Sequence, residues 1–458
     1  MNETNNLTLS FVLAGIVSIS VFFFTSSWAA LFFSLFIFIF GNIFSYTISN
    51  NRNNLSELKV FNWAFLFYVL LSINYFLGYD ADWDSFIQDW RDEYKFFLIA
   101  ETNQNLSIVE NYKNSFIDRV YLEYGLYVFY ISSIASISFG IFDGNHLLTQ
   151  FLGTALFSIL GSVIVYKILS LYVDYKKAYL YTLIFMFFSV FNFYGYNLIR
   201  DIAIAFFYIC GIYFVLDSVK NRSIYKMILM ILCNWLVLEL RFEHGLLFSL
   251  LTAYMGVNVF RKNKVFLLIF SVVMLMLISL MFISKMDMLL LSLNSYTELT
   301  NDAVQSNENS LGKNLYILPP FIKQMAIIFI SQIQPFPSWL NISFTNNIYQ
   351  NFHGFLQIVY SFFWFVVFFS LIKWLILERK IFLLKKELKV LLVICLIFLL
   401  ANTANMTLRR LIGFYPFIFL LYVYIKENFV TYKNFQKTII FAFCFYFFLI
   451  LMYLLIKI

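Results

Sequence analysis

The stretch WAALFFSLFIFIFGNIFSYT, from Trp28 to Thr47, decides the fold class. It holds no charged residue, and as a helix it is long enough to cross the roughly 30 Å hydrocarbon core of a bilayer. A segment in lipid must satisfy its backbone groups internally, so it is either a helix or a strand of a closed barrel. Barrel strands alternate apolar and polar residues, whereas this run is continuously apolar. The stretch therefore predicts a transmembrane helix.

The composition extends this prediction to the whole chain. Of the 458 residues, 62% are hydrophobic and 12% are charged, and the mean hydropathy is +0.79, whereas soluble domains hold about 25% charged residues. We predict one all-α integral membrane domain over residues 1–458, a polytopic helical bundle. Fourteen apolar runs are candidate spans: Leu7–Phe24, Trp28–Thr47, Val60–Gly78, Tyr121–Phe142, Leu147–Leu169, Ala178–Tyr194, Arg200–Leu216, Ile224–Leu240, Gly245–Phe260, Val265–Ser284, Phe355–Leu377, Val390–Ala404, Leu411–Lys426 and Thr438–Ile456.

Basic residues in the short turns predict the orientation of the spans. Lysine-rich turns stay in the cytoplasm, so the two long connections, residues 79–120 and 285–354, are predicted to be extracytoplasmic loops. The first loop holds nine acidic and four basic residues, and the second contains an apolar stretch, ended by prolines, that we interpret as an interfacial helix. The lysine-rich turns are Val173–Lys177, Lys220–Lys226, Arg261–Lys264, Lys373–Lys389 and Lys426–Lys437.

Successive spans should place their connecting turns on alternate sides of the membrane. Between residues 120 and 173 there is one candidate span too many for this alternation. The run Tyr121–Phe142 is interrupted by four serines, so we expect it to be re-entrant or to lie along the outer interface. A misplaced first hairpin is the alternative. The expected fold therefore has about 13 crossings and one re-entrant or interfacial helix.

Several classes of protein and site are excluded. The net charge of +7 comes from Lys and Arg in short turns, which does not indicate nucleic-acid binding. No Walker or GxGxxG sequence is present, so no nucleotide cofactor is expected. The four cysteines lack CxxC spacing and the three histidines are scattered, so no metal site is predicted. A calcium loop starting at Asp80 is rejected, because Ser85 and Arg91 replace its Gly and Glu.

Arginine is the cation of the outward short turns. The chain holds 22 Lys and 10 Arg, yet the four basic residues in these turns are Arg200, Arg241, Arg409 and Arg410. A guanidinium offers a fixed fork for bidentate contact with phosphate. Arg200, Arg241 and Arg410 also open helices, whose N-termini favour anions. If these helix starts converge, they form a pyrophosphate site; the alternative is that each arginine reaches lipid headgroups.

Carboxylates near these arginines are candidates for a catalytic base. Glu243, Glu123 and Asp201 fall at the predicted outer face, where any one of them could accept the proton of an acceptor hydroxyl. His244 could donate to a phosphate or orient Glu243. Asp201 and Glu243 could instead only neutralise the arginines beside them. The candidate glycan contacts are Asp80, Asp82, Asp84 and Tyr124.

Five segments follow one another in a recognisable order. They are GYDADWDSF from Gly78, YLEYGLY from Tyr121, IRDIAIA from Ile199, FEHG from Phe242 and RRLIGFYPF from Arg409. In this order the chain resembles the EpsG and Wzy group of bacterial polysaccharide and O-antigen polymerases, from about residue 78 to 250 and again near the C-terminus. It departs from that group at Asp201, where the group has Gln, and in its first hairpin, which is an addition.

The resemblance implies an integral membrane glycosyltransferase related to the GT-C class. Such an enzyme joins undecaprenyl-pyrophosphate-linked oligosaccharide repeat units into O-antigen, capsular polysaccharide or exopolysaccharide. It acts at the outer face of the bacterial inner (cell) membrane and uses no cofactor. The implied partners are the lipid-linked oligosaccharides, membrane lipids, a chain-length regulator and a flippase, with no nucleic acid among them.

Three other functions compete with polymerisation. A lipid-linked oligosaccharide flippase, or an ion-coupled carrier, would place charges near the membrane midplane, whereas here they gather at helix ends. An O-antigen ligase would use the same chemistry with a different acceptor. An inactive membrane scaffold would need no site at all.

Overall fold

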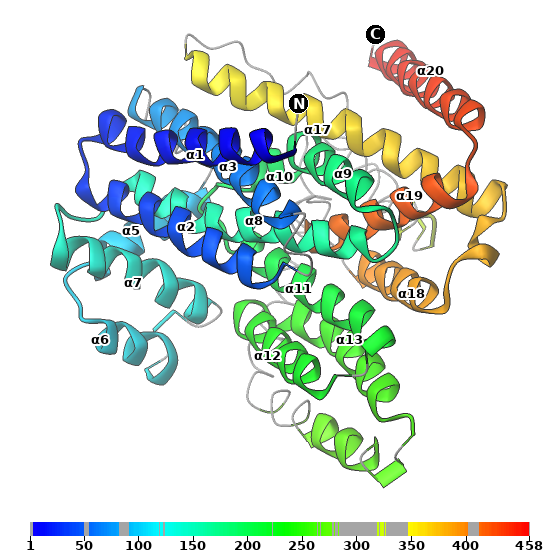
Figure 1. Ribbon diagram of the computed structural model, residues 1–458, viewed down its shortest axis with the longest axis horizontal. Helices are drawn as coiled ribbons and strands as arrows, with labels where there is room; N and C mark the ends of the chain where they lie inside the picture. The colour runs from blue at the N-terminus through cyan, green and yellow to red at the C-terminus, as the bar shows by residue number, and fades with distance from the viewer. Residues whose placement is uncertain are drawn as a thin grey trace. The chain divides into compact units, whose positions relative to one another are not determined.

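The computed structural model describes residues 3–49, 55–81, 91–118, 120–121, 124–221, 223–262, 264–265, 267–276, 279, 283, 318–319, 321–324, 326, 347–401 and 412–457. Every regular element in these ranges is a helix, as Figure 1 shows. This confirms the all-α fold class for the described part of the chain.

Seven of the described helices are long and apolar enough to cross a membrane. They cover Leu7–Thr25, Trp28–Thr47, Ser56–Tyr79, Leu147–Ser170, Arg200–Val219, Ile348–Leu377 and Tyr432–Met452. The protein is therefore membrane-embedded. The other predicted spans fall on shorter or less apolar helices, or partly outside the described residues, so the count of about 13 crossings stays a prediction.

The chain divides into two compact units. Unit 1 comprises Met1–Tyr213 and Ser338–Phe363, and unit 2 comprises Phe214–Pro337 and Trp364–Ile458. Helices α11 (Arg200–Asn221) and α17 (Ile348–Ile372) contribute residues to both units. The other helices of unit 1 are α1 (Glu3–Thr25), α2 (Trp28–Thr47), α3 (Ser56–Ala81), α5 (Arg91–Asn103), α6 (Ile108–Tyr112), the π-helix η1 (Lys113–Ile117), α7 (Gly125–Ile141), α8 (Leu147–Ser170), α9 (Tyr175–Phe188) and α10 (Phe191–Tyr194).

Helix α8 is the core of unit 1. It packs against α2, α3, α7 and α9, and 89% of its span is buried, against 22% for α1. Small residues such as Gly153 and Ser158 let neighbours approach it closely, because an added Cβ at Gly153 would lie 2.6 Å from a methyl group of Ile134. Helices α1 and α2 leave many large apolar side chains exposed, which is the composition that a lipid-facing surface requires.

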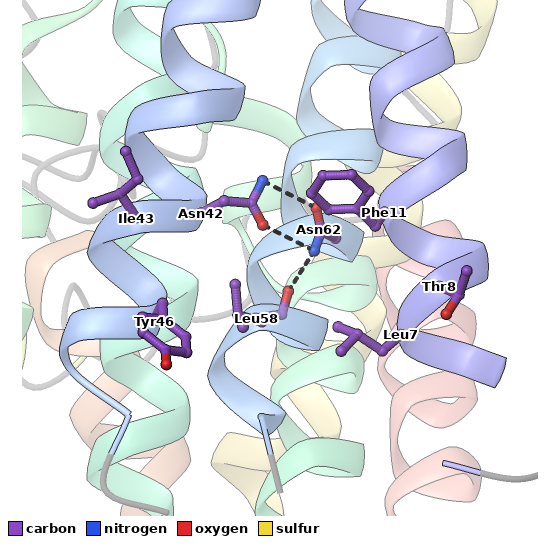
Figure 2. A pocket seen from close by; sticks show the side chains of 8 residues that line it. All are labelled: Leu7, Thr8, Phe11, Asn42, Ile43, Tyr46, Leu58 and Asn62. Atoms are coloured by element: carbon purple, nitrogen blue, oxygen red, sulfur yellow. Dashed lines mark hydrogen bonds between the residues drawn. The ribbon is translucent and has the colours of Figure 1, made fainter. Parts of the chain in front are cut away.

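Helices α1, α2 and α3 surround a small pocket, shown in Figure 2. Apolar side chains line most of it, and two amides lie between α2 and α3. Asn42 Nδ2 donates to Asn62 Oδ1 at 3.4 Å, and Asn62 Nδ2 donates to Asn42 Oδ1 at 3.2 Å. Reciprocal amide pairs of this kind join helices in an apolar environment, where an unpaired amide would be costly.

Polar contacts fix the two ends of unit 1. At one end Lys167 Nζ, near the end of α8, lies 3.4 Å from Glu57 Oε1 and donates to the Ile48 carbonyl at 2.8 Å. At the other end Asn347, before α17, donates to the Gly78 carbonyl of α3 at 3.0 Å. We call the first the inner end and the second the outer end, after their predicted sides.

The segment predicted as the first loop, residues 79–120, contains helices α5, α6 and η1. Helix α6 begins with a capping box, in which the Ser107 hydroxyl and the Glu110 carboxylate each accept a backbone N–H of the other residue. Asn103 Nδ2 of α5 donates to Ser132 Oγ of α7 at 3.0 Å, and Asn111 Nδ2 donates to Ser136 Oγ at 2.8 Å. The serines that interrupt the predicted span therefore hold this segment to α7.

Helix α7 replaces the predicted span Tyr121–Phe142 with one unbroken helix. Its contacts with α8 involve Gln150, Gly153 and Phe157, which lie in the first half of α8. Phe142, just after α7, packs on Phe32 near the start of α2. Helix α7 thus lies beside the first half of α8, and its re-entrant or interfacial position stays a prediction.

Two other spans of unit 1 differ from their predicted bounds. The run Ala178–Tyr194 is not one helix, because α9 ends at Phe188 and Ser189 adopts an extended backbone. The Ser189 hydroxyl then accepts the N–H of Phe191, which starts α10. Helix α17 begins at Ile348, before the predicted start at Phe355, because Asn347 Oδ1 accepts the N–H groups of its first turn.

Unit 2 contains the hairpin of α12 (Ile224–Leu240) and α13 (Phe242–Phe260), with Arg241 as the one residue between them. Gly245 permits this sharp turn, because an added Cβ there would lie 2.3 Å from Leu238 Cγ and 2.6 Å from Leu238 Cα. Further described helices of unit 2 are η3 (Lys373–Leu377), η4 (Lys380–Leu383), α18 (Lys386–Ala401), α19 (Tyr415–Phe429) and α20 (Tyr432–Lys457), together with the short apolar helix Leu267–Met276.

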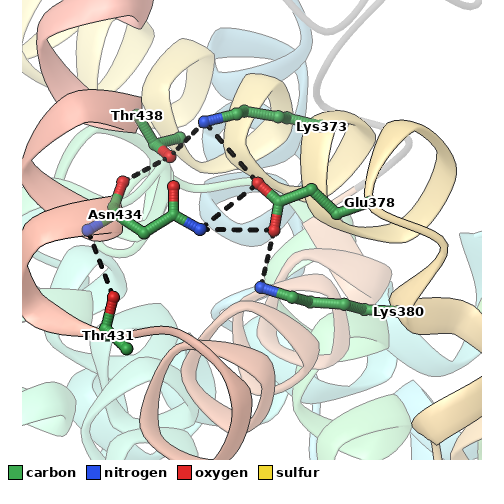
Figure 3. A network of polar contacts seen from close by, with 6 residues as sticks. All are labelled: Lys373, Glu378, Lys380, Thr431, Asn434 and Thr438. Atoms are coloured by element: carbon green, nitrogen blue, oxygen red, sulfur yellow. Dashed lines mark hydrogen bonds and ion pairs between the residues drawn. The ribbon is translucent and has the colours of Figure 1, made fainter.

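Glu378 joins the turn after η3 to the start of α20, as Figure 3 shows. Its carboxylate lies 2.7 Å from Lys380 Nζ and 3.6 Å from Lys373 Nζ, and it accepts from Asn434 Nδ2 at 3.4 Å. Partial burial would raise the pKa of Glu378, but Lys380, Asn434 and Lys373 outweigh burial and lower it. Glu378 therefore balances two lysines of the predicted cytoplasmic turn Lys373–Lys389.

We expect Asp143 to stabilise the start of α2 through its charge. Its carboxylate accepts the backbone N–H groups of Trp28 at 2.9 Å and Ala29 at 3.1 Å, and the Ser27 hydroxyl at 3.2 Å. Partial burial would raise the pKa of Asp143, but these bonds outweigh it and hold the pKa below the usual 3.8. Asp143→Ala should lower the free energy of unfolding by about 0.5–1 kcal/mol at pH 7 in thermal unfolding of the purified protein.

Because the folded-state pKa of Asp143 is depressed, its contribution is present above pH 3.8 and is lost as the pH falls through the folded-state pKa. The difference in the free energy of unfolding between wild type and Asp143→Ala should therefore disappear as the pH falls below the folded-state pKa of Asp143. Asp118→Ala is the control, since the one ion pair of Asp118 with a described residue is an exposed 4.0 Å contact with Lys113. Equal losses in the two variants would contradict the capping role.

We expect Gly245→Ala to destabilise the α12–α13 hairpin by about 1–3 kcal/mol, because α12 would have to move away from the new methyl group. Gly140→Ala is the matched control: it lies in α7, and an added Cβ meets nothing within 4 Å. That control should be neutral or stabilising by up to about 1 kcal/mol. The measurement is the unfolding temperature of the two purified variants in the same detergent. A Gly245→Ala protein as stable as wild type would contradict the close approach of Leu238 to Gly245.

Candidate functional site

Arg200 is held at the start of α11 by a tight turn after α10. Gly195 donates its N–H to the Phe191 carbonyl, and an added Cβ at Gly195 would lie 2.3 Å from that oxygen and 2.6 Å from the ring of Tyr68. The Ile199 N–H then bonds the Asn197 carbonyl at 2.7 Å. Arg200 follows as the first residue of α11, and it is only 7% exposed.

Arg200 and Lys95 share one aromatic ring. The Cζ atom of Arg200 lies 4.4 Å from the ring centroid of Tyr124, and the Nζ atom of Lys95 lies 4.4 Å from the same centroid. A cation is attracted to the face of an aromatic ring, and the attraction grows when the cation is desolvated, as Arg200 is. Tyr124 thus brings together a buried guanidinium and an exposed ammonium.

Glu93, two residues before Lys95, is 3% exposed. Its Oε2 atom accepts the hydroxyl of Tyr75 at 2.8 Å and that of Tyr79 at 2.7 Å. The two tyrosines are one turn apart on α3, so both can reach the same oxygen. Two short bonds to one carboxylate oxygen stabilise its charged form, so this arrangement favours an anchoring role over that of a base.

A tyrosine–histidine pair extends this cluster. The Tyr196 hydroxyl and His353 Nδ1 lie 2.8 Å apart, and the His353 ring stacks on Phe193 at 4.1 Å and contacts Tyr75 at 4.7 Å. Burial, and then the charge of Glu93, raises the pKa of the Tyr196 phenol, which is therefore neutral at pH 7. Helices α3, α5 and α17 are thus joined to the turn before Arg200.

Two predicted site residues are brought together by the structure. Arg200, predicted to bind pyrophosphate, lies on the ring of Tyr124, which was predicted to contact glycan. Asp201 follows Arg200 and is buried. Asp80 lies in the last turn of α3. The predicted residues Asp82, Asp84, Glu123, Arg409 and Arg410 lie outside the described residues.

The other predicted site residues belong to unit 2, at the α12–α13 turn. Arg241 is buried in an extended conformation between the two helices, and Glu243 is half-buried in the first turn of α13. His244 is buried, with its ring edge-on to Phe398 at 4.9 Å. These three residues are held by the hairpin that Gly245 permits.

Sequence reasoning missed Lys95, Glu93, Tyr75 and Tyr79. A signal for the tyrosines was present, because Tyr75 and Tyr79 have the i, i+4 spacing of one helix face. Glu93 and Lys95 lay in the segment 79–120, which was predicted to be an extracytoplasmic loop. In the described part of the chain, no group of His, Cys, Asp and Glu side chains could hold a metal ion.

Comparison with known proteins finds no matching protein family, no similar curated protein and no similar solved structure. The function is therefore inferred from the chemistry of the residues.

We expect Tyr79→Phe to destabilise the protein by about 1.5–3 kcal/mol, because Glu93 would lose a donor to its buried charge. Tyr121→Phe is the matched control: the Tyr121 hydroxyl donates to the neutral Asn103 Oδ1 at 2.9 Å, so its loss should cost about 0.5–1.5 kcal/mol.

Thermal unfolding in detergent measures both changes. The triple variant Tyr75→Phe, Tyr79→Phe and Glu93→Leu removes charge and donors together, so it should recover much of the lost stability. A triple variant less stable than Tyr79→Phe would show that Glu93 is not held mainly by the two phenols.

Proposed function

We propose that the protein is a membrane glycosyltransferase of the GT-C class that polymerises undecaprenyl-pyrophosphate-linked oligosaccharide repeat units. The observation that carries this proposal is the buried guanidinium of Arg200 on the ring of Tyr124, at the predicted outer end of a membrane-embedded unit. A lipid headgroup contact alone would leave the arginine at the lipid surface. A buried, ring-held guanidinium is suited instead to a fixed anionic substrate.

The proposed reaction exchanges one bond at the anomeric carbon. A hydroxyl oxygen of the acceptor repeat unit forms a bond to the anomeric carbon of the donor chain, while the bond from that carbon to the pyrophosphate oxygen breaks. Undecaprenyl pyrophosphate leaves with the electron pair, and a carboxylate takes the hydroxyl proton. Arg200 stabilises the charge that develops on the leaving group.

The remaining roles are assigned by proximity in the sequence and by residue type. Asp201, beside Arg200, is a candidate base, as are Glu123 and Glu243 with His244. Arg241, Arg409 and Arg410 are proposed as further pyrophosphate contacts. The acidic segment from Asp80 is proposed to contact glycan. The proposed location is the bacterial inner membrane, and the proposed partners include a flippase and a chain-length regulator.

Deletion of the gene and electrophoresis of the surface glycan test the proposal. A lost polymerase leaves one repeat unit on each lipid acceptor. Complete absence of surface repeats would indicate a flippase or ligase instead. A scaffold would change the glycan only through a partner, so complementation with a folded, inactive variant separates a scaffold from an enzyme.

Arg200→Lys is the sharper test, because lysine keeps the charge but not the fork. We expect polymer formation to fall roughly 10- to 100-fold at equal protein level, since Arg200 acts on developing charge. Arg261→Lys is the control, because Arg261 is exposed at a predicted cytoplasmic turn. Full polymerisation by the Arg200→Lys variant would show that bidentate phosphate recognition does not operate at this position.

A further inference from the structure

We propose that Lys95 is the second cation of the Arg200 site and that the two together bind a diphosphate group, not a single phosphate. This inference rests on the proposed function, because it names the chemistry that the same site recognises. Lys95 lies on α5 and Arg200 on α11, and each contacts the ring of Tyr124 at 4.4 Å. The two cationic groups therefore lie no farther apart than twice this distance.

Two like charges near one ring repel each other, and an anionic ligand beside them lowers that repulsion. Lys95 forms no ion pair with any residue that the structure describes, and its contact is with Tyr124. Arg200 is buried and Lys95 exposed, so a ligand entering from outside meets the ammonium first and the guanidinium deeper. Two cations at different depths suit two linked phosphoryl groups, with the fork on one and the point charge on the other.

Two buried neighbours of Lys95, which share one face of α5, fix the position of this helix. Glu93 is anchored to Tyr75 and Tyr79 of α3. Phe96, one turn from Glu93, packs on Tyr124 at 5.4 Å and on Tyr127 of α7 at 4.8 Å. Lys95 lies between these two anchors in the sequence, so its Cα cannot drift from Tyr124. Glu93 is thus a positioning residue for the ammonium.

An independent feature beside Arg200 also indicates a ligand. Both polar atoms of the Asn197 carboxamide are buried, and neither has a hydrogen-bond partner in the described part of the chain. A buried amide without a partner destabilises a protein, so it is usually retained for a purpose. Asn197 lies three residues before Arg200, in the turn that presents the guanidinium.

Binding of inorganic pyrophosphate and inorganic phosphate to the full-length protein tests this proposal. Titration calorimetry in phosphatidylcholine nanodiscs should show tighter binding of pyrophosphate. Lys95→Gln should weaken pyrophosphate binding roughly tenfold and leave phosphate binding nearly unchanged, while Lys95→Arg should keep most of the affinity. Lys113→Gln is the matched control, because Lys113 is an exposed lysine of the same segment.

Equal pyrophosphate affinity in Lys95→Gln and wild type would overturn the proposal, as would an equal loss in Lys113→Gln, which would indicate only general charge attraction. Nanodiscs containing phosphatidylglycerol distinguish the ligand source: if this lipid displaces pyrophosphate, the site holds a headgroup and the proposal fails. Lys95-dependent pyrophosphate binding in a protein whose deletion leaves polymer intact would uphold this inference and reject polymerisation. If deletion abolishes the polymer but pyrophosphate binding does not depend on Lys95, the result would uphold polymerisation and reject this inference.

Discussion

The hydrogen bonds to the carboxyl group of Glu93 are the interaction on which the outer end of unit 1 depends. Burying a carboxyl group is costly unless hydrogen bonds replace its water, and Tyr75 and Tyr79 supply two such bonds from one face of α3. Because α5 is held at Glu93, it brings Lys95 and Phe96 to Tyr124. One long apolar helix thereby positions a more polar one, and that second helix completes the candidate site.

The long spans of unit 1 were predictable because lipid demands apolar residues along the whole length of a helix. Trp28–Thr47 is reproduced by α2, and Leu147–Leu169 by α8, to within one residue at the end. Composition does not report backbone breaks, so the extended residue Ser189 between α9 and α10 was missed. Helix α5 was read as loop because its stability comes from packing on α7 and from Glu93, which hydropathy does not detect.

Less of the candidate site could be predicted than of the fold. Arg200 stood out because arginine was the cation of the outward turns, and Tyr124 because it lies in a recognisable segment. Their contact joins residues far apart in the chain, which no local pattern reports. The sequence analysis assigned Tyr75 and Tyr79 no role, whereas their hydroxyls hold Glu93. The contribution of Arg241 and His244 stays a prediction, because they belong to unit 2.

The bonds from Asp143 to the start of α2 have a consequence for biosynthesis. The ribosome adds about 115 residues after Trp28 before it reaches Asp143, which takes roughly 6–23 s at 5–20 residues per second. During that interval the first helical hairpin can enter the bilayer with only the Ser27 hydroxyl to cap α2. The hairpin is therefore inserted early, and its contact with Asp143 forms only after α7 has been synthesised. That contact joins the start of α2 to the later helices of unit 1.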